Sequence, residues 1–370
     1  MLMGLAVALA FSLALVALPR LQRAPSLCVM SLIGAGCYYW REFAGFLLVI
    51  LAAYATTRWL RQVQISRRWN RACIVLLSLV VLFTLGRLRH WDKLLTLPAP
   101  AALVLYSLDM WLALRLVTLL WEVGSGLVDP PFLSYITWVC LPLTLVGPIL
   151  RYSQMPANLY IDRALFKSMR WWMGLISGSA KLAAGLGLAE VQLWISGQLG
   201  SGAIETKAMS ALLTGPISFY LVTAGYFQLM EVLGRPCGFK LPMSFDFPIG
   251  RENISAFWMN WNMTATFVFR DYLFYNRWGF QSYNIYFNTV LLFTLVGLWH
   301  AANAYWILWG MLHGVLFCLF LLWKKYNSRV NFLPFRGTVL AATGARLLTY
   351  LSVCACWYLP SKILQKLAFA

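Results

Sequence analysis

Long apolar segments recur along the whole chain and constrain its fold more than any other feature. A helix needs about 20 apolar residues to cross the hydrocarbon core of a bilayer, and the chain is 61% hydrophobic and only 11% charged. The sequence therefore predicts an all-α, polytopic integral membrane protein with about 10–11 transmembrane or re-entrant helices. The candidate spans are 2–18, 26–40, 43–57, 72–86, 98–121, 132–150, 172–197, 208–233, 283–302, 303–323 and 339–359.

The charge balance is strongly basic, with 30 Lys and Arg against 12 Asp and Glu. Cytoplasmic loops of membrane proteins collect Lys and Arg, and basic faces there attract anionic lipid head groups. The segments Thr56–Arg71 and Lys324–Arg329 fit such loops. Because no nucleic-acid motif is present, membrane lipids and not nucleic acids are the expected partners.

The charges also give a partial topology. Arg20 and Arg23 follow the first apolar run, which favours a retained first span with its N-terminus outside. A cytoplasmic 58–71 loop would place the acidic segment Glu122–Pro131 inside as well, which fits poorly. We therefore expect that one segment between residues 72 and 150 does not cross simply.

The eight cysteines fit neither a metal site nor a disulfide framework. Cys354 and Cys356 form a C-x-C and not the C-x-x-C pair of zinc sites, and most cysteines lie in apolar runs, where they act as small hydrophobic residues. No metal site and no bound cofactor is expected. No repeat or long linker divides the chain, so residues 1–370 are predicted to form a single membrane-embedded domain.

Two stretches do not behave as ordinary spans. In Cys140–Pro156, residues Pro142, Gly147 and Pro148 would break a regular helix. Such a break is tolerated where it is buried in protein or lines a cavity. Taken alone, however, this stretch favours a simple kink at the end of a span.

The second unusual stretch, Leu241–Phe280, is too polar for a lipid-facing span and too aromatic for a solvated loop. It predicts an amphipathic segment at the interface, or one that dips partway into the membrane. A helix is expected to begin near Asn253. Four residues are expected on one face of this helix, with Asn262 at its border: Phe257, Trp258, Trp261 and Ala265.

Two of the three histidines, His300 and His313, lie in sequence apolar enough for a membrane. A polar group there is a candidate functional residue, although a structural hydrogen bond between helices is the common alternative. Apolar surroundings disfavour a charged imidazole, so His300 would be available as a general base at neutral pH. Asn303, three residues further on, is within its reach if the chain stays helical.

Four elements of the sequence resemble the membrane-bound O-acyltransferase (MBOAT) family, closest to its bacterial polysaccharide-acetylating members. The chain reads "LVGPILRY" at 145–152, "AGYFQLMEVLGRPCGFKLPMSFDFP" at 224–248, "ISAFWMNWNMTATFVFRDYLF" at 254–274 and "GLWHAANAYWILWGMLHG" at 297–314. Together they cover a family-like core of about 140–325. Residues 1–139 and 326–370 match only as additional membrane helices.

The resemblance implies roles for particular residues. His300 maps to the family's catalytic base, and Asn262 maps to a second polar position where bacterial polysaccharide-type members usually carry His. Asn262 cannot act as a base, but its amide can donate to a carbonyl or oxyanion. Three further positions depart from the pattern: Ala301 stands where the family has Gly, and Met259 and Asn260 stand where basic residues are common.

Further residues of these elements are predicted to serve the site. His313 is expected to be supportive, since Gly310 and Gly314 suit close helix packing around it. Arg270 and Asp271 are adjacent, do not share a helix face, and are expected to pair with different partners. The predicted substrate-binding residues are Trp258, Trp261, Arg270, Asp271, Tyr272, Trp299, Asn303 and Tyr226.

The remaining polar and aromatic residues of the spans receive more ordinary interpretations. Trp306 and Trp309 are expected to pack, with only Trp299 bordering the proposed base. His90 is interpreted as a solvated interfacial residue. Two charged residues of the fifth span, Asp109 and Arg115, are expected to face the protein interior without pairing.

The resemblance implies an enzyme of the bacterial inner membrane. It would transfer an acyl group, most simply acetyl, from acyl-CoA or an acyl-carrier-protein thioester to a hydroxyl of an exported polysaccharide. An extracytoplasmic accessory protein would complete the delivery. Two alternatives stay open: acylation of a lipid or protein hydroxyl, and a transporter with His300 and His313 as relays, although related halves are not visible.

Overall fold

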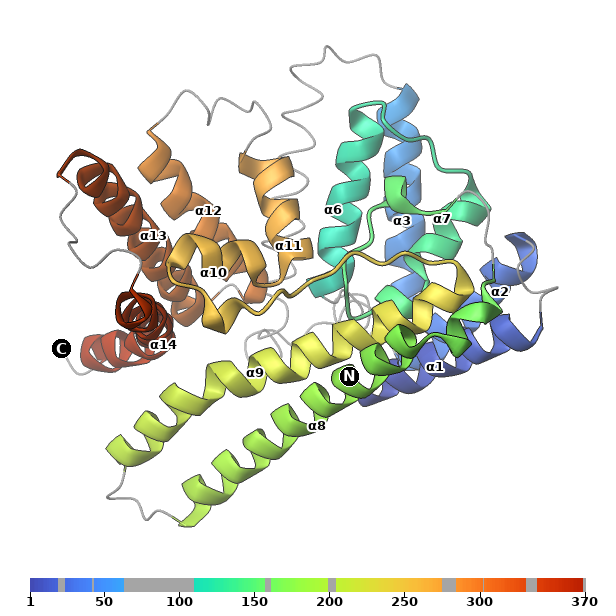
Figure 1. The fold of residues 1–370 in the computed structure, drawn as a ribbon. Helices are drawn as coiled ribbons and strands as arrows, with labels where there is room; N and C mark the ends of the chain where they lie inside the picture. Colours follow the sequence, from blue (N-terminus) through green and yellow to red (C-terminus); the bar gives the residue numbers. More distant parts are fainter. Residues whose placement is uncertain are drawn as a thin grey trace. The chain divides into compact units, whose positions relative to one another are not determined.

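The computed structural model describes residues 1–18, 24–41, 43–62, 110–156, 161–198, 204–274, 284–301, 303–330 and 338–368 (Figure 1). Every regular element in these ranges is a helix, which confirms the all-α prediction. The predicted span 72–86 and the residues His90 and Asp109 lie outside the described ranges.

The chain divides into two compact units. Unit 1 comprises Met1–Gly178 and Tyr226–Met243, and unit 2 comprises Ser179–Gly225 and Ser244–Ala370. The long helices α8 (Met169–Gln198) and α9 (Ile204–Gly234) contribute residues to both units. That residues 1–370 form a single domain stays a prediction.

Four helices within the described ranges are long and apolar enough to cross a membrane: Phe43–Gln62, Thr214–Cys237, Ala304–Asn327 and Val339–Leu367. Three shorter apolar helices accompany them, over Leu2–Ala17, Pro25–Tyr38 and Ile285–His300. Long apolar helices are the form in which a chain satisfies its backbone hydrogen bonds in lipid. The protein is therefore an integral membrane protein.

Unit 1 is built from helices and short 3₁₀ turns. Its elements are α1 (Leu2–Ala17), α2 (Ala24–Tyr38), α3 (Phe43–Gln62), α6 (Met110–Gly124), α7 (Phe132–Val139), η3 (Pro142–Thr144), η4 (Tyr152–Gln154), η5 (Arg163–Lys167), the start of α8, the end of α9 and η7 (Arg235–Cys237).

The predicted 132–150 span is wrong, because α7 ends after eight residues at Val139. The fully buried Arg115 donates hydrogen bonds to two carbonyl groups, that of Trp138 near the end of α7 and that of Thr144 in the broken stretch, the latter at 3.3 Å. The stretch is therefore a broken, buried segment and not a kinked span. Arg115 faces the protein interior, as predicted.

A second set of buried polar contacts holds the end of this stretch. The indole Nε1 of Trp138 donates to the carbonyl of Leu150 at 2.9 Å. The backbone N–H of Ser153 donates to the Glu122 carboxylate at 3.1 Å, and the Ser153 hydroxyl donates to the same carboxylate. Side chains thus satisfy backbone groups that a regular helix would have paired internally.

Unit 2 holds the elements that form the candidate site. They are the rest of α8 and α9, η8 (Pro248–Gly250), α10 (Ile254–Asn260), α11 (Met263–Val268), the π-helical turn η9 (Phe269–Phe274), α12 (Ile285–His300), α13 (Ala304–Val330) and α14 (Val339–Ala368). In Figure 1, α12 and α13 lie side by side.

The close approach of α12 and α13 depends on small residues. A methyl group on Gly310 would lie 2.9 Å from the carbonyl carbon of Phe293, and one on Gly314 would lie 2.7 Å from Cα of Val290. No room is left for a side chain at either position. The predicted packing role of Gly310 and Gly314 is confirmed.

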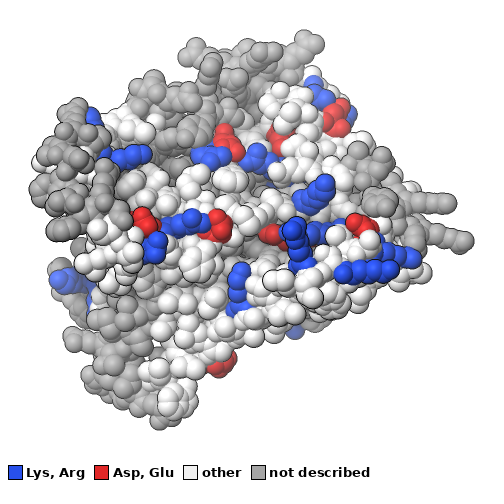
Figure 2. Space-filling model, in the orientation of Figure 1, with Lys and Arg blue, Asp and Glu red and all other residues white. Residues whose placement is uncertain are grey.

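Charged side chains of both signs adjoin one another at several places on the face drawn in Figure 2. In unit 1 the Nη1 of Arg58 lies 2.7 Å from the Oδ1 of Asp129, and in unit 2 the Nη2 of Arg346 lies 3.0 Å from the Oε1 of Glu252. Such half-exposed pairs contribute little to stability. They do offset part of the basic excess of the surface.

Candidate active site

The predicted helix start at Asn253 is confirmed. Asn253 caps α10, and its Oδ1 accepts a hydrogen bond from the backbone N–H of Ala256 at 2.8 Å. The prediction of one continuous helix through Ala265 is wrong, because α10 ends at Asn260. Trp261 is extended, and Asn262 adopts a left-handed conformation with φ 41° and ψ 53°.

A crossing segment explains this break. The backbone N–H of Met263 donates to the carbonyl of Ser244 at 2.7 Å, and that of Asp246 donates to the carbonyl of Asn260 at 3.1 Å. These contacts replace the helical hydrogen bonds between α10 and α11. Asn tolerates left-handed backbone better than most residues.

The aromatic residues around the break are buried despite the interruption. Trp261 stacks on Phe257 with the ring centroids 5.2 Å apart, and Phe245 packs edge-on against Trp261 at 5.6 Å. Trp258 packs against Phe293 of α12 at 5.1 Å. Phe257, Trp258, Trp261 and Phe293 belong to one buried hydrophobic cluster of unit 2, and the partly buried Phe245 packs against it.

His300 is the last residue of α12, and the chain turns directly after it. Ala301 is extended, and the side-chain oxygen of Asn303 accepts a hydrogen bond from the N–H of Trp306 at 3.0 Å. The chain does not stay helical to Asn303, so the condition for the predicted helical contact with His300 is not met. Asn303 instead caps the start of α13.

Three indole rings surround the imidazole of His300. Trp306 stacks on it with centroids 4.5 Å apart, Trp299 lies at 4.7 Å, and Trp309 meets it edge-on at 5.3 Å. The prediction that only Trp299 borders His300 is wrong. The turn at Ala301 folds α13 back, which brings two further tryptophans to the ring.

A cavity of about 280 Å³ lies in unit 2 between α10–η9 and the α12–α13 pair. This volume is near the lower end of the range for small-molecule sites. Its wall is mainly apolar and aromatic. Six polar residues of the described ranges line it: Ser255, Asn262, Thr266, Arg270, Thr289 and His300.

Some of these polar groups already make hydrogen bonds within the protein. The hydroxyls of Thr266 and Thr289 donate to the carbonyls of Trp261 and Ile285, at 3.0 and 2.8 Å. The buried Oδ1 of Asn262 has no hydrogen-bond partner within the described part of the chain. A buried polar group without a partner is uncommon in folded proteins, which marks Asn262 as a candidate functional residue.

The cavity brings together six of the predicted site residues: Trp258, Trp261, Asn262, Arg270, Trp299 and His300. Asp271, Tyr272 and Asn303 are not part of its lining. Tyr226 is buried in unit 1 and does not line it either. The roles predicted for these residues stay predictions.

The pairing predicted for Arg270 and Asp271 is wrong. The Nε of Arg270 donates to the Asp271 carboxylate at 2.8 Å, so the two residues pair with each other. The guanidinium also lies over the Phe267 ring, 4.6 Å from its centroid. Arg270 and Asp271 follow Phe267 by three and four residues, so both lie beside Phe267 on the helix surface. The Arg270 side chain lies across the Phe267 ring and from there contacts Asp271.

His313 lies completely buried on α13, behind the cavity wall. Its ring centroid is 4.5 Å from that of Trp309 and 5.0 Å from that of Trp258, and neither ring nitrogen makes a hydrogen bond within the described residues. Trp309 therefore contacts both histidines. That His313 supports the site stays a prediction.

Sequence reasoning missed the α12 wall of the cavity. Thr289, Phe293 and Val296 line it together with His300. Their spacing of four, three and four residues is that of one helix face. Counting back from His300 in these steps would have found them.

The fold and the cavity define a class: an all-α membrane protein with a cavity lined by an asparagine and by a histidine that three indole rings contact. No family model matches the chain. Individual proteins do match it, and they confirm the resemblance to MBOAT-family acyltransferases.

Three bacterial relatives illustrate the similarity. The chain is 31% identical over 150 residues to a teichoic acid D-alanyltransferase of Bacillus subtilis, covering 37% of this chain and 36% of the relative. It is 26% identical over 204 residues to a peptidoglycan O-acetyltransferase of Helicobacter pylori, covering 51% and 39%. It is 36% identical over 101 residues to a probable alginate O-acetylase AlgI of Pseudomonas aeruginosa, covering 26% and 19%. Each match thus spans well under half of the relative's length.

Proposed function

We propose that the chain is an O-acyltransferase of the bacterial inner membrane. It moves an acetyl group from a cytoplasmic thioester, acyl-CoA or an acyl carrier protein, to a hydroxyl of an exported or cell-surface polysaccharide. The observation that carries the proposal is that His300 and Asn262, from separate elements, line one cavity. The names of the peptidoglycan and alginate relatives support the choice of acetyl and polysaccharide.

His300 acts as the general base. Its neutral imidazole takes the proton of the acceptor hydroxyl while the hydroxyl oxygen attacks the thioester carbonyl carbon. The new C–O bond forms, the C–S bond breaks, and the proton passes from His300 to the departing thiolate, which leaves as a thiol. The stacked Trp306 ring stabilises the transient imidazolium through its π-face.

Asn262 serves the reacting carbonyl. Its side-chain amide donates a hydrogen bond to the carbonyl oxygen as negative charge develops there. The amide of Asn262 cannot take up a proton at neutral pH, so His300 is the one base among the described residues that line the cavity. The guanidinium of Arg270, about a third exposed at the cavity, contacts the anionic donor, although Asp271 offsets part of its charge.

An extracytoplasmic accessory protein receives or delivers the acyl group outside the membrane. This part of the proposal rests on the acceptor: an exported polysaccharide lies beyond the bilayer, whereas the thioester is cytoplasmic. The cavity would then be the point at which donor and acceptor meet.

The test is acyl transfer by a His300→Ala variant. We expect the variant to insert normally and to lose about 10²- to 10⁴-fold in rate, the usual contribution of a general base. Leu298→Ala is the matched control, because Leu298 lies two residues away on α12 and does not line the cavity. Transfer by His300→Ala at the parental rate would overturn the assignment.

Mass spectrometry of surface glycans, lipids and proteins from cells with and without the chain identifies the acceptor. Acetyl groups missing from a polysaccharide alone are expected. Loss from a lipid or a protein would replace the proposed acceptor but keep the enzyme class. An unchanged acyl pattern in every fraction would favour the transporter alternative.

A further inference from the structure

The break that exposes Asn262 to the cavity is held from both sides by the segment Ser244–Asp246. One backbone hydrogen bond joins this segment to Asn260, two residues before Asn262, and another joins it to Met263, directly after. The hydroxyls of Ser244 and Thr264 are also 3.3 Å apart. The backbone of Asn262 is therefore fixed between two anchored neighbours.

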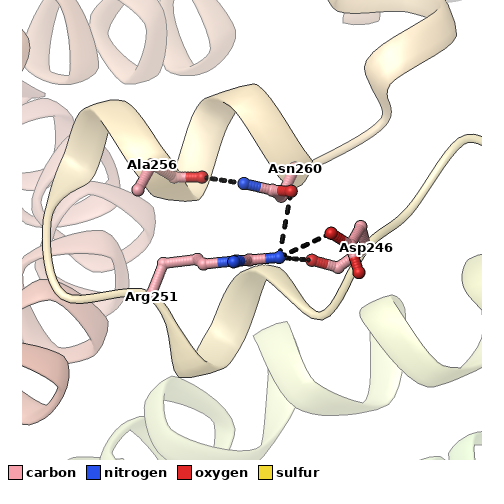
Figure 3. Close-up of polar contacts among 4 residues, drawn as sticks. All are labelled: Asp246, Arg251, Ala256 and Asn260. Atoms are coloured by element: carbon pink, nitrogen blue, oxygen red, sulfur yellow. Dashed lines mark hydrogen bonds and ion pairs between the residues drawn. The ribbon is translucent and has the colours of Figure 1, made fainter.

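A single arginine ties the same two segments together through side chains (Figure 3). The Nη2 of Arg251 donates to the carbonyl oxygen of Asp246 at 2.7 Å, to its carboxylate at 2.7 Å, and to Oδ1 of Asn260 at 3.1 Å. The Nδ2 of Asn260 donates in turn to the carbonyl of Ala256 at 2.7 Å, in the last turn of α10. We call Arg251, Asp246 and Asn260 the Arg251 clamp.

None of the three clamp residues lines the cavity. Any effect of the clamp on the site must therefore pass through the backbone to Asn262. A non-glycine residue with positive φ persists only where its surroundings fix it. The clamp and the two backbone hydrogen bonds supply that constraint.

We propose that Arg251 is a positioning residue: it holds Asn262 in the left-handed conformation that places its amide at the cavity. The catalytic role of Asn262 in this inference rests on the proposed function, whereas the contacts of the Arg251 clamp do not depend on it. The side chains of Arg251 and Asp246 are 34% and 53% exposed. Ion pairs this exposed add little to folding stability, so loss of the clamp should loosen the break without unfolding the protein.

The chain offers a matched control. Arg346 of α14 pairs with Glu252, the neighbour of Arg251, at 3.0 Å, with both side chains about half exposed. Arg346→Ala removes a comparable ion pair next to the clamp without touching Asn260 or Asp246. It is expected to leave transfer unchanged.

The first measurement is hydrogen exchange of the full-length protein in lipid nanodiscs, followed by mass spectrometry. Arg251→Ala should speed exchange in peptides that cover residues 244–246 and 260–264, whose amides form the crossing hydrogen bonds. Arg346→Ala should leave these peptides as in the parent. Equal exchange in the two variants would overturn the proposal, whatever the activity.

The second measurement is steady-state acyl transfer. Arg251→Ala should lower kcat about 10- to 100-fold, the range for a slightly displaced catalytic group, with the KM for the donor unchanged. The double variant Arg251→Ala/Asn262→Ala should be no slower than Asn262→Ala alone, because both changes remove one function. Additive losses would overturn the proposal. Faster exchange in Arg251→Ala, with full activity in Asn262→Ala, would support the clamp and overturn the catalytic role of Asn262.

Discussion

Gly297 is the position where a single methyl group should do most damage to the site. A Cβ built on Gly297 would lie 2.9 Å from the carbonyl carbon of Trp306, closer still to its oxygen, and 3.4 Å from the nitrogen of Gly310. These are backbone atoms of α13, which cannot rotate aside. Carbon atoms pack favourably at about 3.5–4.0 Å, so α12 and α13 must separate by about 0.6 Å or more.

Two opposing terms set the stability of Gly297→Ala. Overpacking of this kind costs about 1–3 kcal/mol, whereas replacing a helical glycine by alanine gains about 0.5–1 kcal/mol. The cost exceeds the gain, so the variant should be less stable. The same displacement moves Trp306 away from His300, and a shift approaching 1 Å at a catalytic group can lower the rate by about 10²-fold.

Gly344→Ala is the control, because a Cβ at Gly344 on α14 meets no atom within 4 Å. Thermal unfolding in detergent and acyl transfer should be measured for both variants. Gly344→Ala should melt at or above the parental temperature with full activity, and Gly297→Ala should fall in both. A Gly297→Ala protein as stable and active as Gly344→Ala would refute the close approach of α12 and α13.

Two further substitutions test the other contacts. Asn262→Ala should lower kcat by about 10²- to 10³-fold, as loss of an oxyanion donor does. Met259→Ala, at the same cavity, should change kcat little. Equal losses of acyl transfer in the two variants would mean that Asn262 only packs. Arg115→Met should lower the folded yield in size-exclusion chromatography, because it removes two buried hydrogen bonds from a charged donor, each worth about 1.5–3 kcal/mol. Arg58→Ala, which removes only a half-exposed ion pair, should match the parent, and a normal yield from Arg115→Met would contradict the buried contacts.

Local signals in the sequence predicted several features of the structure. The apolar runs predicted long helices, and Pro248 followed by Arg251 and Glu252 predicted the start of α10 near Asn253, which caps the helix. Gly310 and Gly314 predicted the close approach of α13 to a neighbour. Each of these features depends on residues close together in the chain.

The breaks inside helical patterns could not be predicted, because distant residues cause them. The carbonyls of Trp138 and Thr144, on either side of the end of α7, accept hydrogen bonds from Arg115, which lies more than twenty residues earlier. The α10–α11 break depends on Ser244, whose carbonyl accepts from Met263. Apolar periodicity records which residues are buried, and these residues are buried whether or not the helix continues.

The break after His300 shows why such interruptions matter for the chemistry. In a continuous helix Trp306 would lie six residues beyond His300, or about 9 Å along the axis, and could not stack on it. The turn at Ala301 reverses the chain and brings the two rings to 4.5 Å. Ala301 stands where the MBOAT pattern has Gly, yet its φ of −168° and ψ of 139° are extended values that any residue adopts. The backbone of Ala301 is therefore unstrained, and the aromatic cage of His300 does not require a glycine at this position.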